Sequence, residues 1–168
     1  LTVVEFSDFL CPYCSKAAKF LKIAGSGHHD KAQFVFRHYP LDKASNPRIS
    51  SNVHPGACLL AEGAVCAHEQ SRFWAYHDIA FETSGKISRS VVEKIAEKIE
   101  LDVNTFNSCL DSGRARKVVT EDINAAIQAG VTATPTLIIN GRTLRGIPKP
   151  WVLNELLKFS EKNLAPPQ

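Results

Sequence analysis

The feature that most constrains the fold is a pair of cysteines, Cys11 and Cys14, placed where a strand is predicted to give way to a helix. Residues 1–6 are rich in β-branched and aromatic side chains, which is typical of a strand. Residues 15–23 carry apolar side chains at helical spacing. Pro12 suits the first helical position, where an N–H would be unpaired anyway. Cys11 is therefore predicted at a helix N-terminus, where free N–H groups and the helix dipole stabilise a thiolate, the reactive form of cysteine.

Two other uses of such a pair are zinc ligation and a static structural disulfide. Zinc ligation requires a second pair of cysteines or histidines at short spacing. Cys58 and Cys66 are too far apart to form one, and His28-His29 stands alone in a glycine-flanked loop. The sequence therefore predicts no metal site, and the rest of the chain must decide between a redox pair and a static disulfide.

The first half of the chain continues as a βαβ unit followed by helices. Residues 32–39 are predicted as a second strand, parallel to the first. Residues 41–55 are polar and proline-containing, as expected of a connecting loop. The following block is predicted to be helical, with an alanine-rich helix over 56–70, an aromatic helix from residue 73, a helix capped by Ser88 and a helix capped by Asp102.

The last third is predicted to return to the sheet. Residues 114–129 form a helical pattern that ends at Gly130. Two short strand patterns, 136–139 and 142–145, flank Asn140-Gly141, the strongest hairpin signal in the sequence. Pro150 is expected to open a final helix that covers the sheet.

Two segments together resemble a known family. Residues 5–14 read Glu-Phe-Ser-Asp-Phe-Leu-Cys-Pro-Tyr-Cys, and residues 130–136 read Gly-Val-Thr-Ala-Thr-Pro-Thr. In this order and at this separation they resemble the thioredoxin superfamily and, within it, the DsbA-like thiol:disulfide oxidoreductases of the bacterial cell envelope. The resemblance implies an α/β thioredoxin fold built from residues 1–40 and 114–168, with an inserted α-helical subdomain at 41–113. It also implies dithiol–disulfide exchange by Cys11 and Cys14 without a bound cofactor.

The resemblance assigns further roles around the cysteine pair. Read from the sequence alone, Pro135 is a turn or strand-start proline. The resemblance implies instead a cis Thr134-Pro135 bond beside the dithiol, a conformation that costs only ~0.5–1 kcal/mol. It places the Thr134 backbone where a substrate strand could pair, with Pro12 and Tyr13 also on the substrate-binding surface.

Glu5 has two interpretations. It could be a solvated carboxylate or one paired with a lysine. By its position it resembles the superfamily's buried acid, whose pKa is raised by desolvation and which would exchange a proton with Cys14.

Tyr13 departs from the histidine of the commonest DsbA-like pattern, so the direction of exchange stays open. An oxidase is favoured. The alternatives are a reductase or isomerase of the same fold, and a non-catalytic peptide-binding module whose disulfide is structural.

Three cysteines lie outside the pair. If 56–70 is one helix, Cys58 and Cys66 are about 12 Å apart along its axis, beyond the ~7 Å between Cα atoms that a disulfide spans. Either could instead meet Cys109, or all three could be reduced core residues. Related domains often carry a cysteine pair in such places, which favours Cys66–Cys109 and leaves Cys58 as a buried free thiol.

Composition indicates a single globular domain. The 168 residues are 44% hydrophobic, contain no apolar run of membrane-spanning length, and carry a net charge of +3 in scattered lysines and arginines, so nucleic-acid binding has no particular support. Methionine is absent. We therefore expect either a removed signal peptide or a piece of a longer, membrane-anchored protein.

By resemblance, the protein is extracytoplasmic and its substrates are unfolded or reduced proteins. The same resemblance implies reoxidation by a quinone-linked membrane partner of the DsbB or vitamin K epoxide reductase type.

Overall fold

A mixed sheet forms the centre of the structure, a computed structural model that describes residues 2–26, 32–51, 53–149, 151–152 and 155. The strand order is β2-β1-β3-β4. β1 and β2 run parallel, β3 is antiparallel to β1, and β4 is antiparallel to β3. Their bounds are Thr2–Ser7 (β1), Gln33–His38 (β2), Thr136–Ile139 (β3) and Arg142–Arg145 (β4).

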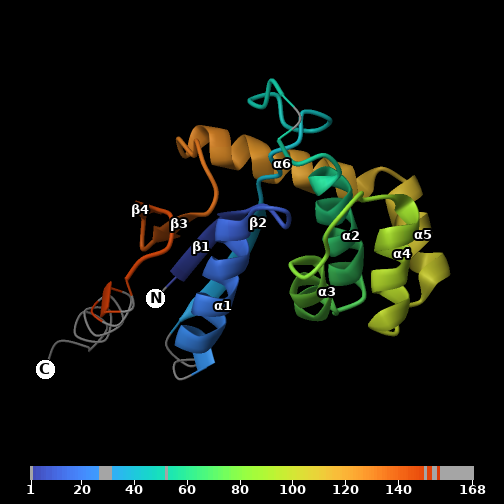
Figure 1. Ribbon diagram of the computed structural model, residues 1–168, viewed down its shortest axis with the longest axis horizontal. Helices are drawn as coiled ribbons and strands as arrows, with labels where there is room; N and C mark the ends of the chain where they lie inside the picture. Colours follow the sequence, from blue (N-terminus) through green and yellow to red (C-terminus); the bar gives the residue numbers. More distant parts are fainter. Residues whose placement is uncertain (1, 27–31, 52, 150, 153–154, 156–168) are drawn as a thin grey trace, which may run out of the picture.

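The helices fall into two groups around this sheet (Figure 1). α1 lies beside the strands, and α2 to α5 gather at one side of the sheet, while α6 extends across the top of the view from above the strands to that group. α6 packs against α2, α5 and β2. The helix bounds are Pro12–Ser26 (α1), Ala57–Glu69 (α2), Phe73–Ala80 (α3), Arg89–Lys98 (α4), Val103–Asp111 (α5) and Arg114–Gln128 (α6).

The two faces of the central strand β1 pack against different cores, because successive side chains of a strand point to opposite faces. Val3 belongs to a small apolar cluster with Leu21 of α1 and with Leu137 and Ile139 of β3. Phe6 belongs to the larger cluster, which continues into α2 to α6. Odd-numbered residues of β1 therefore face α1, and this decides where Glu5 and Ser7 lie.

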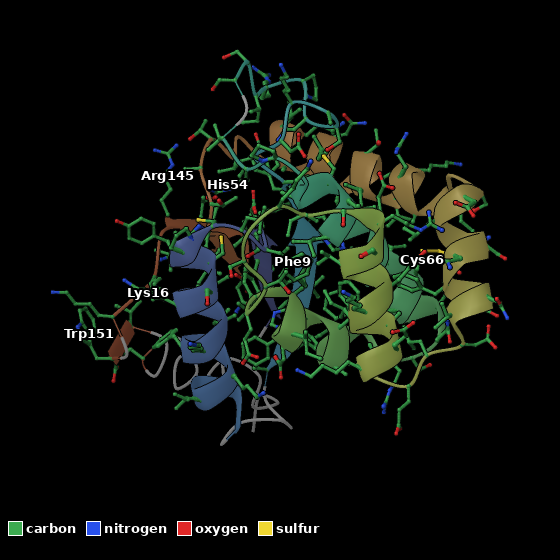
Figure 2. The ribbon with its side chains drawn as sticks, turned by 45° about the vertical axis from the view of Figure 1, so that its right-hand side comes forward. Phe9, Lys16, His54, Cys66, Arg145 and Trp151 are labelled. Atoms are coloured by element: carbon green, nitrogen blue, oxygen red, sulfur yellow. A yellow bond between two sulfur atoms is a disulfide. The ribbon has the colours of Figure 1, made fainter. Side chains whose placement is uncertain are left out.

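The larger core contains a disulfide. Cys66 of α2 and Cys109 of α5 are bonded, with their Cα atoms 5.7 Å apart, and both side chains are buried. Figure 2 labels Cys66 among these helices, on the far side of the molecule from Lys16 of α1. The expected Cys66–Cys109 pairing is thus present, and Cys58 is a buried free thiol as predicted.

Most predicted turns and caps occur where the sequence placed them. Asn140 and Gly141 both have positive φ angles, 46° and 81°, and they join β3 to β4. The Asp102 carboxylate accepts a hydrogen bond from the Thr105 N–H at the start of α5. Ser88 also occupies an N-cap position, but its side chain makes no capping hydrogen bond, so that part of the prediction is wrong. The predicted final helix falls largely outside the described residues.

No helix in the described part of the chain is long and apolar enough to cross a bilayer.

Candidate active site

Cys11 lies at the junction of β1 and α1. Its N–H donates to the Asp8 carbonyl at 3.1 Å, which closes the turn, and its carbonyl accepts the Ser15 N–H at 3.1 Å in the first turn of the helix. The Thr134 carbonyl lies 3.6 Å from its sulfur, and the Thr134-Pro135 peptide bond is cis. Two segments more than 120 residues apart in sequence therefore meet at one sulfur atom.

The surroundings of Cys11 favour its ionised form. A hydrogen bond from the Cys14 thiol is the largest cause, and together with the Thr134 side chain and the N–H groups of Tyr13 and Cys14 it lowers the pKa of Cys11 to about 5, against the opposing effect of burial. In the described residues the buried Thr134 hydroxyl has no hydrogen-bond partner of standard geometry, so it is available to this sulfur. These groups therefore favour the thiolate of Cys11 at neutral pH.

Cys14 has the opposite tendency. Its side chain is fully buried, and burial together with the hydrogen bond to Cys11 raises its pKa far above that of an ordinary thiol. The Ser7 hydroxyl and the Asp8 N–H, which points at the Cys14 sulfur from 3.5 Å, oppose this only in part. The two sulfurs are thus prepared for different roles, one as an anion and one as a protonated thiol.

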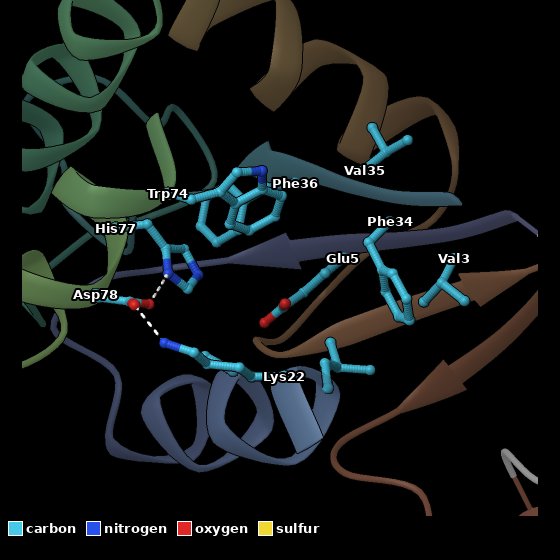
Figure 3. A pocket seen from close by; sticks show the side chains of 11 residues that line it. Val3, Glu5, Lys22, Phe34, Val35, Phe36, Trp74, His77 and Asp78 are labelled. Atoms are coloured by element: carbon cyan, nitrogen blue, oxygen red, sulfur yellow. Dashed lines mark hydrogen bonds and ion pairs between the residues drawn. The ribbon is translucent and has the colours of Figure 1, made fainter. Parts of the chain in front are cut away.

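Glu5 is buried in the middle of β1, on the face toward α1. Desolvation raises its pKa to about 7, although a hydrogen bond from the Ser7 hydroxyl to Oε1 at 2.9 Å works in the other direction. The carboxyl points into a cavity of about 420 Å³ between β1, β2, α1 and α3 (Figure 3). Glu5 can therefore gain or lose a proton near neutral pH.

The surface next to Cys11 is open. Cys11 itself is only 5% exposed, but Tyr13 is 64% exposed and Pro12 is exposed as well. The Lys16 ammonium lies 5.6 Å from the centre of the Tyr13 ring. Pro135 is buried and Thr134 half-buried beside the pair. A partner chain can thus approach Cys11 across Pro12 and Tyr13.

The sequence profile of DSBA-like thioredoxin domains matches residues 2–158. The chain belongs to the DSBA-like thioredoxin domain family. The predicted α/β class, a thioredoxin fold with added helices, is confirmed with it.

The curated relatives of this DSBA-like domain are much longer proteins. The chain is 33% identical over 146 residues to a protein of Salinispora tropica named Na(+)/H(+) antiporter NhaA 3, a match that covers 87% of this chain and 21% of that protein. It is 32% identical over 146 residues to the NhaA antiporter of Herminiimonas arsenicoxydans, with 87% and 22% covered. The chain therefore spans about a fifth of the length of the relatives it matches.

Solved structures share the DSBA-like fold at lower identity. A thioredoxin-like oxidoreductase from Silicibacter pomeroyi superposes with a TM-score of 0.78 at 22% identity, over 96% of this chain and 86% of that one. Oxidised BdbD from Bacillus subtilis gives 0.78 at 20% identity, with 96% and 87% covered. The thiol-disulfide exchange protein alpha-DsbA2 from Wolbachia pipientis gives 0.78 at 19% identity, with 94% and 80% covered.

The structure also shows residues that the sequence did not single out for this site. Asp8 is buried and accepts hydrogen bonds from the Leu10 N–H at 2.7 Å and the Leu41 N–H at 2.6 Å. Its Oδ2 also lies 2.9 Å from Nδ1 of His54, a residue of the loop before α2. Asp8 thereby ties that loop to the turn that holds Cys11. Ser7 is the other residue that the sequence did not single out.

Proposed function

We propose that this DSBA-like domain is a thiol:disulfide oxidoreductase acting on protein substrates, with Cys11 and Cys14 as the redox pair. The observation that carries the proposal is the Cys11 sulfur, whose pKa is lowered to about 5 and which lies against the Thr134 carbonyl beside the cis bond. A stabilised thiolate is both a nucleophile and a good leaving group in exchange.

The reaction is written from the oxidised protein. A substrate thiolate attacks the Cys11 sulfur, a mixed disulfide forms, and Cys14 leaves and takes up a proton. A second substrate thiolate then attacks the substrate sulfur of the mixed disulfide. The substrate leaves as a disulfide and Cys11 leaves as a thiolate, so two electrons have passed from the substrate to the pair.

We infer that the net direction is oxidation of substrates, because the lower the pKa of Cys11, the more the reduced form is favoured. The exposed Pro12 and Tyr13 and the Thr134 backbone would bind the substrate strand, with Pro135 shaping the loop. Glu5 would supply and remove the proton of Cys14. The helices of residues 41–113 would form an inserted subdomain that leaves this surface open.

The cellular setting belongs to the same proposal. An extracytoplasmic location and a quinone-linked membrane partner follow from the family resemblance. The curated relatives are named as Na(+)/H(+) antiporters, and such transport takes place at a membrane, which supports a domain held close to one.

The test is the equilibrium of the Cys11–Cys14 pair with glutathione, in protein carrying Cys58→Ala so that only this pair titrates. An oxidase should give a potential less negative than roughly −200 mV. A clearly more negative value would favour the reductase or isomerase. If Cys11 resists alkylation after mild reduction while the fold persists, the pair is a structural disulfide and the enzyme proposal fails.

A further inference from the structure

Proton transfer between the Cys14 thiol and the Glu5 carboxyl requires a path between these two buried groups. Cys14 must take up or lose a proton in each half of the exchange, and both it and Glu5 are buried. General acid–base catalysis needs donor and acceptor within hydrogen-bonding reach, directly or through one intermediate group. Ser7 occupies the place of such a group.

Ser7 lies two residues after Glu5 on β1, so the two side chains are on the same face of the strand. Its side chain is 1% exposed, and its hydroxyl donates to Glu5 Oε1 at 2.9 Å. This is the only hydrogen bond found for the Glu5 carboxyl among the described residues. The Ser7 hydroxyl is therefore already hydrogen-bonded to the proposed proton acceptor, Glu5.

The other end of the connection reaches Cys14. That residue lies in the first turn of α1, which packs on the same face of the sheet. Ser7 directly precedes Asp8 on this side of the sheet, and its buried hydroxyl is near enough to lower the pKa of the Cys14 thiol. The next residue, Asp8, directs its N–H at the same sulfur from 3.5 Å, which fixes the end of β1 beside it. A hydroxyl can accept one proton while it donates another, so Ser7 can bridge the pair.

Glu5 also has a way to exchange protons with water. It lines the cavity of about 420 Å³, which is large enough to hold several water molecules. Lys22, Asp78 and His77 lie on one side of that cavity (Figure 3). They form a chain in which Asp78 binds Lys22 Nζ at 2.5 Å and His77 Nδ1 at 3.1 Å. Phe34, Phe36 and Trp74 also line the cavity, and the rings of Phe36 and Trp74 lie 5.3 and 5.1 Å from that of His77.

We propose that Ser7 is a catalytic proton-relay residue whose hydroxyl carries the proton between Cys14 and Glu5, and that the cavity connects Glu5 with solvent. When Cys14 attacks the mixed disulfide, its S–H proton passes to Ser7 Oγ while the Ser7 proton passes to the Glu5 carboxylate. When Cys14 leaves as a thiolate, both transfers run in reverse. The relay rests on the proposed thiol–disulfide exchange and adds a residue to it.

The test separates the two sulfurs in one experiment. Reduced protein carrying Cys58→Ala is mixed with the aromatic disulfide DTNB, which releases one coloured thiolate when Cys11 attacks and a second when Cys14 displaces it. In Ser7→Ala the first release should keep its rate within about twofold, and the second should slow by about 10- to 100-fold. Ser7→Thr, which restores a hydroxyl, should recover the second rate to within a few-fold.

The outcomes are distinguishable. If the parent protein shows no first release, the proposed exchange itself fails. If the parent shows both releases and Ser7→Ala matches it, the relay is overturned. If Ser7→Thr is as slow as Ser7→Ala, Ser7 acts by packing and the relay is likewise overturned.

A measurement on the parent protein covers the case in which the variants do not fold. In mixtures of light and heavy water, a relay that moves two protons in one step gives a curved dependence of the second rate on deuterium fraction. A straight line, or no isotope effect, contradicts the relay.

Discussion

The molecule contains two cysteine pairs, which differ in their bonding and in the groups that surround their sulfur atoms. Cys11 and Cys14 are free thiols at the start of α1, whereas Cys66 and Cys109 are joined across 43 residues between two helices. All four side chains are at most 5% exposed, so burial alone does not separate them. What separates them is the polar groups around the first pair, where backbone N–H groups, the Thr134 side chain and the Ser7 hydroxyl shift the pKa values of the thiols.

The second pair lies in an apolar core. Cys66 and Cys109 belong to the same cluster as Tyr76 and Phe106, with no approach for a partner chain. The disulfide restricts the conformations of the unfolded chain, and in the folded protein it links helix α2 covalently to helix α5. The groups around the sulfurs, more than their exposure, therefore distinguish the proposed redox pair from the structural one, and four predictions test this.

The largest expected effect is on activity. Cys11→Ser should lower the rate of exchange with a peptide disulfide by at least about 10³-fold, because the nucleophilic thiolate is lost. The double variant Cys66→Ala/Cys109→Ala should keep that rate within about threefold at a temperature where it remains folded. Equal losses in the two variants would show that the pairs are not functionally distinct.

The second effect is on stability, and it falls on the other pair. The Cys66–Cys109 bond closes a loop of 43 residues, for which the chain-entropy relation gives about 4 kcal/mol. Urea unfolding of Cys66→Ala/Cys109→Ala should show a loss of about 3–4 kcal/mol. The matched control is Cys58→Ala, which removes a buried thiol without breaking a bond. A loss below about 1 kcal/mol in the double variant would mean that the bond is not what holds these helices.

The sequence predicted the first pair far better than its surroundings. A strand before Cys11, Pro12 at the first helical position and the hairpin at Asn140-Gly141 are local signals, and each occurs as predicted. The cis bond before Pro135 and the Cys66–Cys109 pairing came from the family resemblance. Local sequence carries no information on which distant segments meet.

The residues that escaped prediction depend on those distant meetings. Ser7 lies close to Cys14 only because α1 packs on its face of β1. Asp8 contacts His54 only because the loop before α2 folds back against the turn after β1. Both read as ordinary turn and strand-end residues in the sequence. Ser88 lies at the N-cap position but makes no capping hydrogen bond. The preference for serine at this position does not determine the side-chain rotamer.

The third effect concerns Glu5, the buried acid near the proposed redox pair. Because its pKa is about 7 in the folded protein and about 4.5 unfolded, the folded state binds more protons between those values, and stability falls as pH rises through that range. Glu5→Gln removes this cost. The variant should be more stable than the parent by roughly 2–3 kcal/mol at pH 8, with little difference at pH 4.

Urea unfolding at pH 4, 6 and 8 measures this difference. Glu121→Gln, on the exposed side of α6, is the control and should not change the stability at any of these pH values. A Glu5→Gln variant that is less stable than the parent at pH 8 would mean that the carboxylate is not desolvated.

The smallest effect concerns the thiolate itself, and it distinguishes the reduced from the oxidised protein. The pKa of Cys11 is about 5 in the folded reduced form and about 9 unfolded, so the unfolded state binds more protons between these values. The stability from this group is therefore fully present above pH 9 and is lost as pH falls through 5. Only the reduced form has it, because a disulfide sulfur does not titrate.

Unfolding of both redox forms between pH 4 and 9 measures this contribution. The stability of the reduced form relative to the oxidised form should rise with pH from about 5, by on the order of 1–2 kcal/mol at neutrality once solvent screening at the partly open sulfur is allowed for. Reduced Cys11→Ala should lose that rise, while reduced Cys58→Ala should keep it. A flat difference in the parent would mean that the start of α1 and the Thr134 side chain do not hold an anion. The polar groups around the first pair would then not be what separates it from Cys66–Cys109.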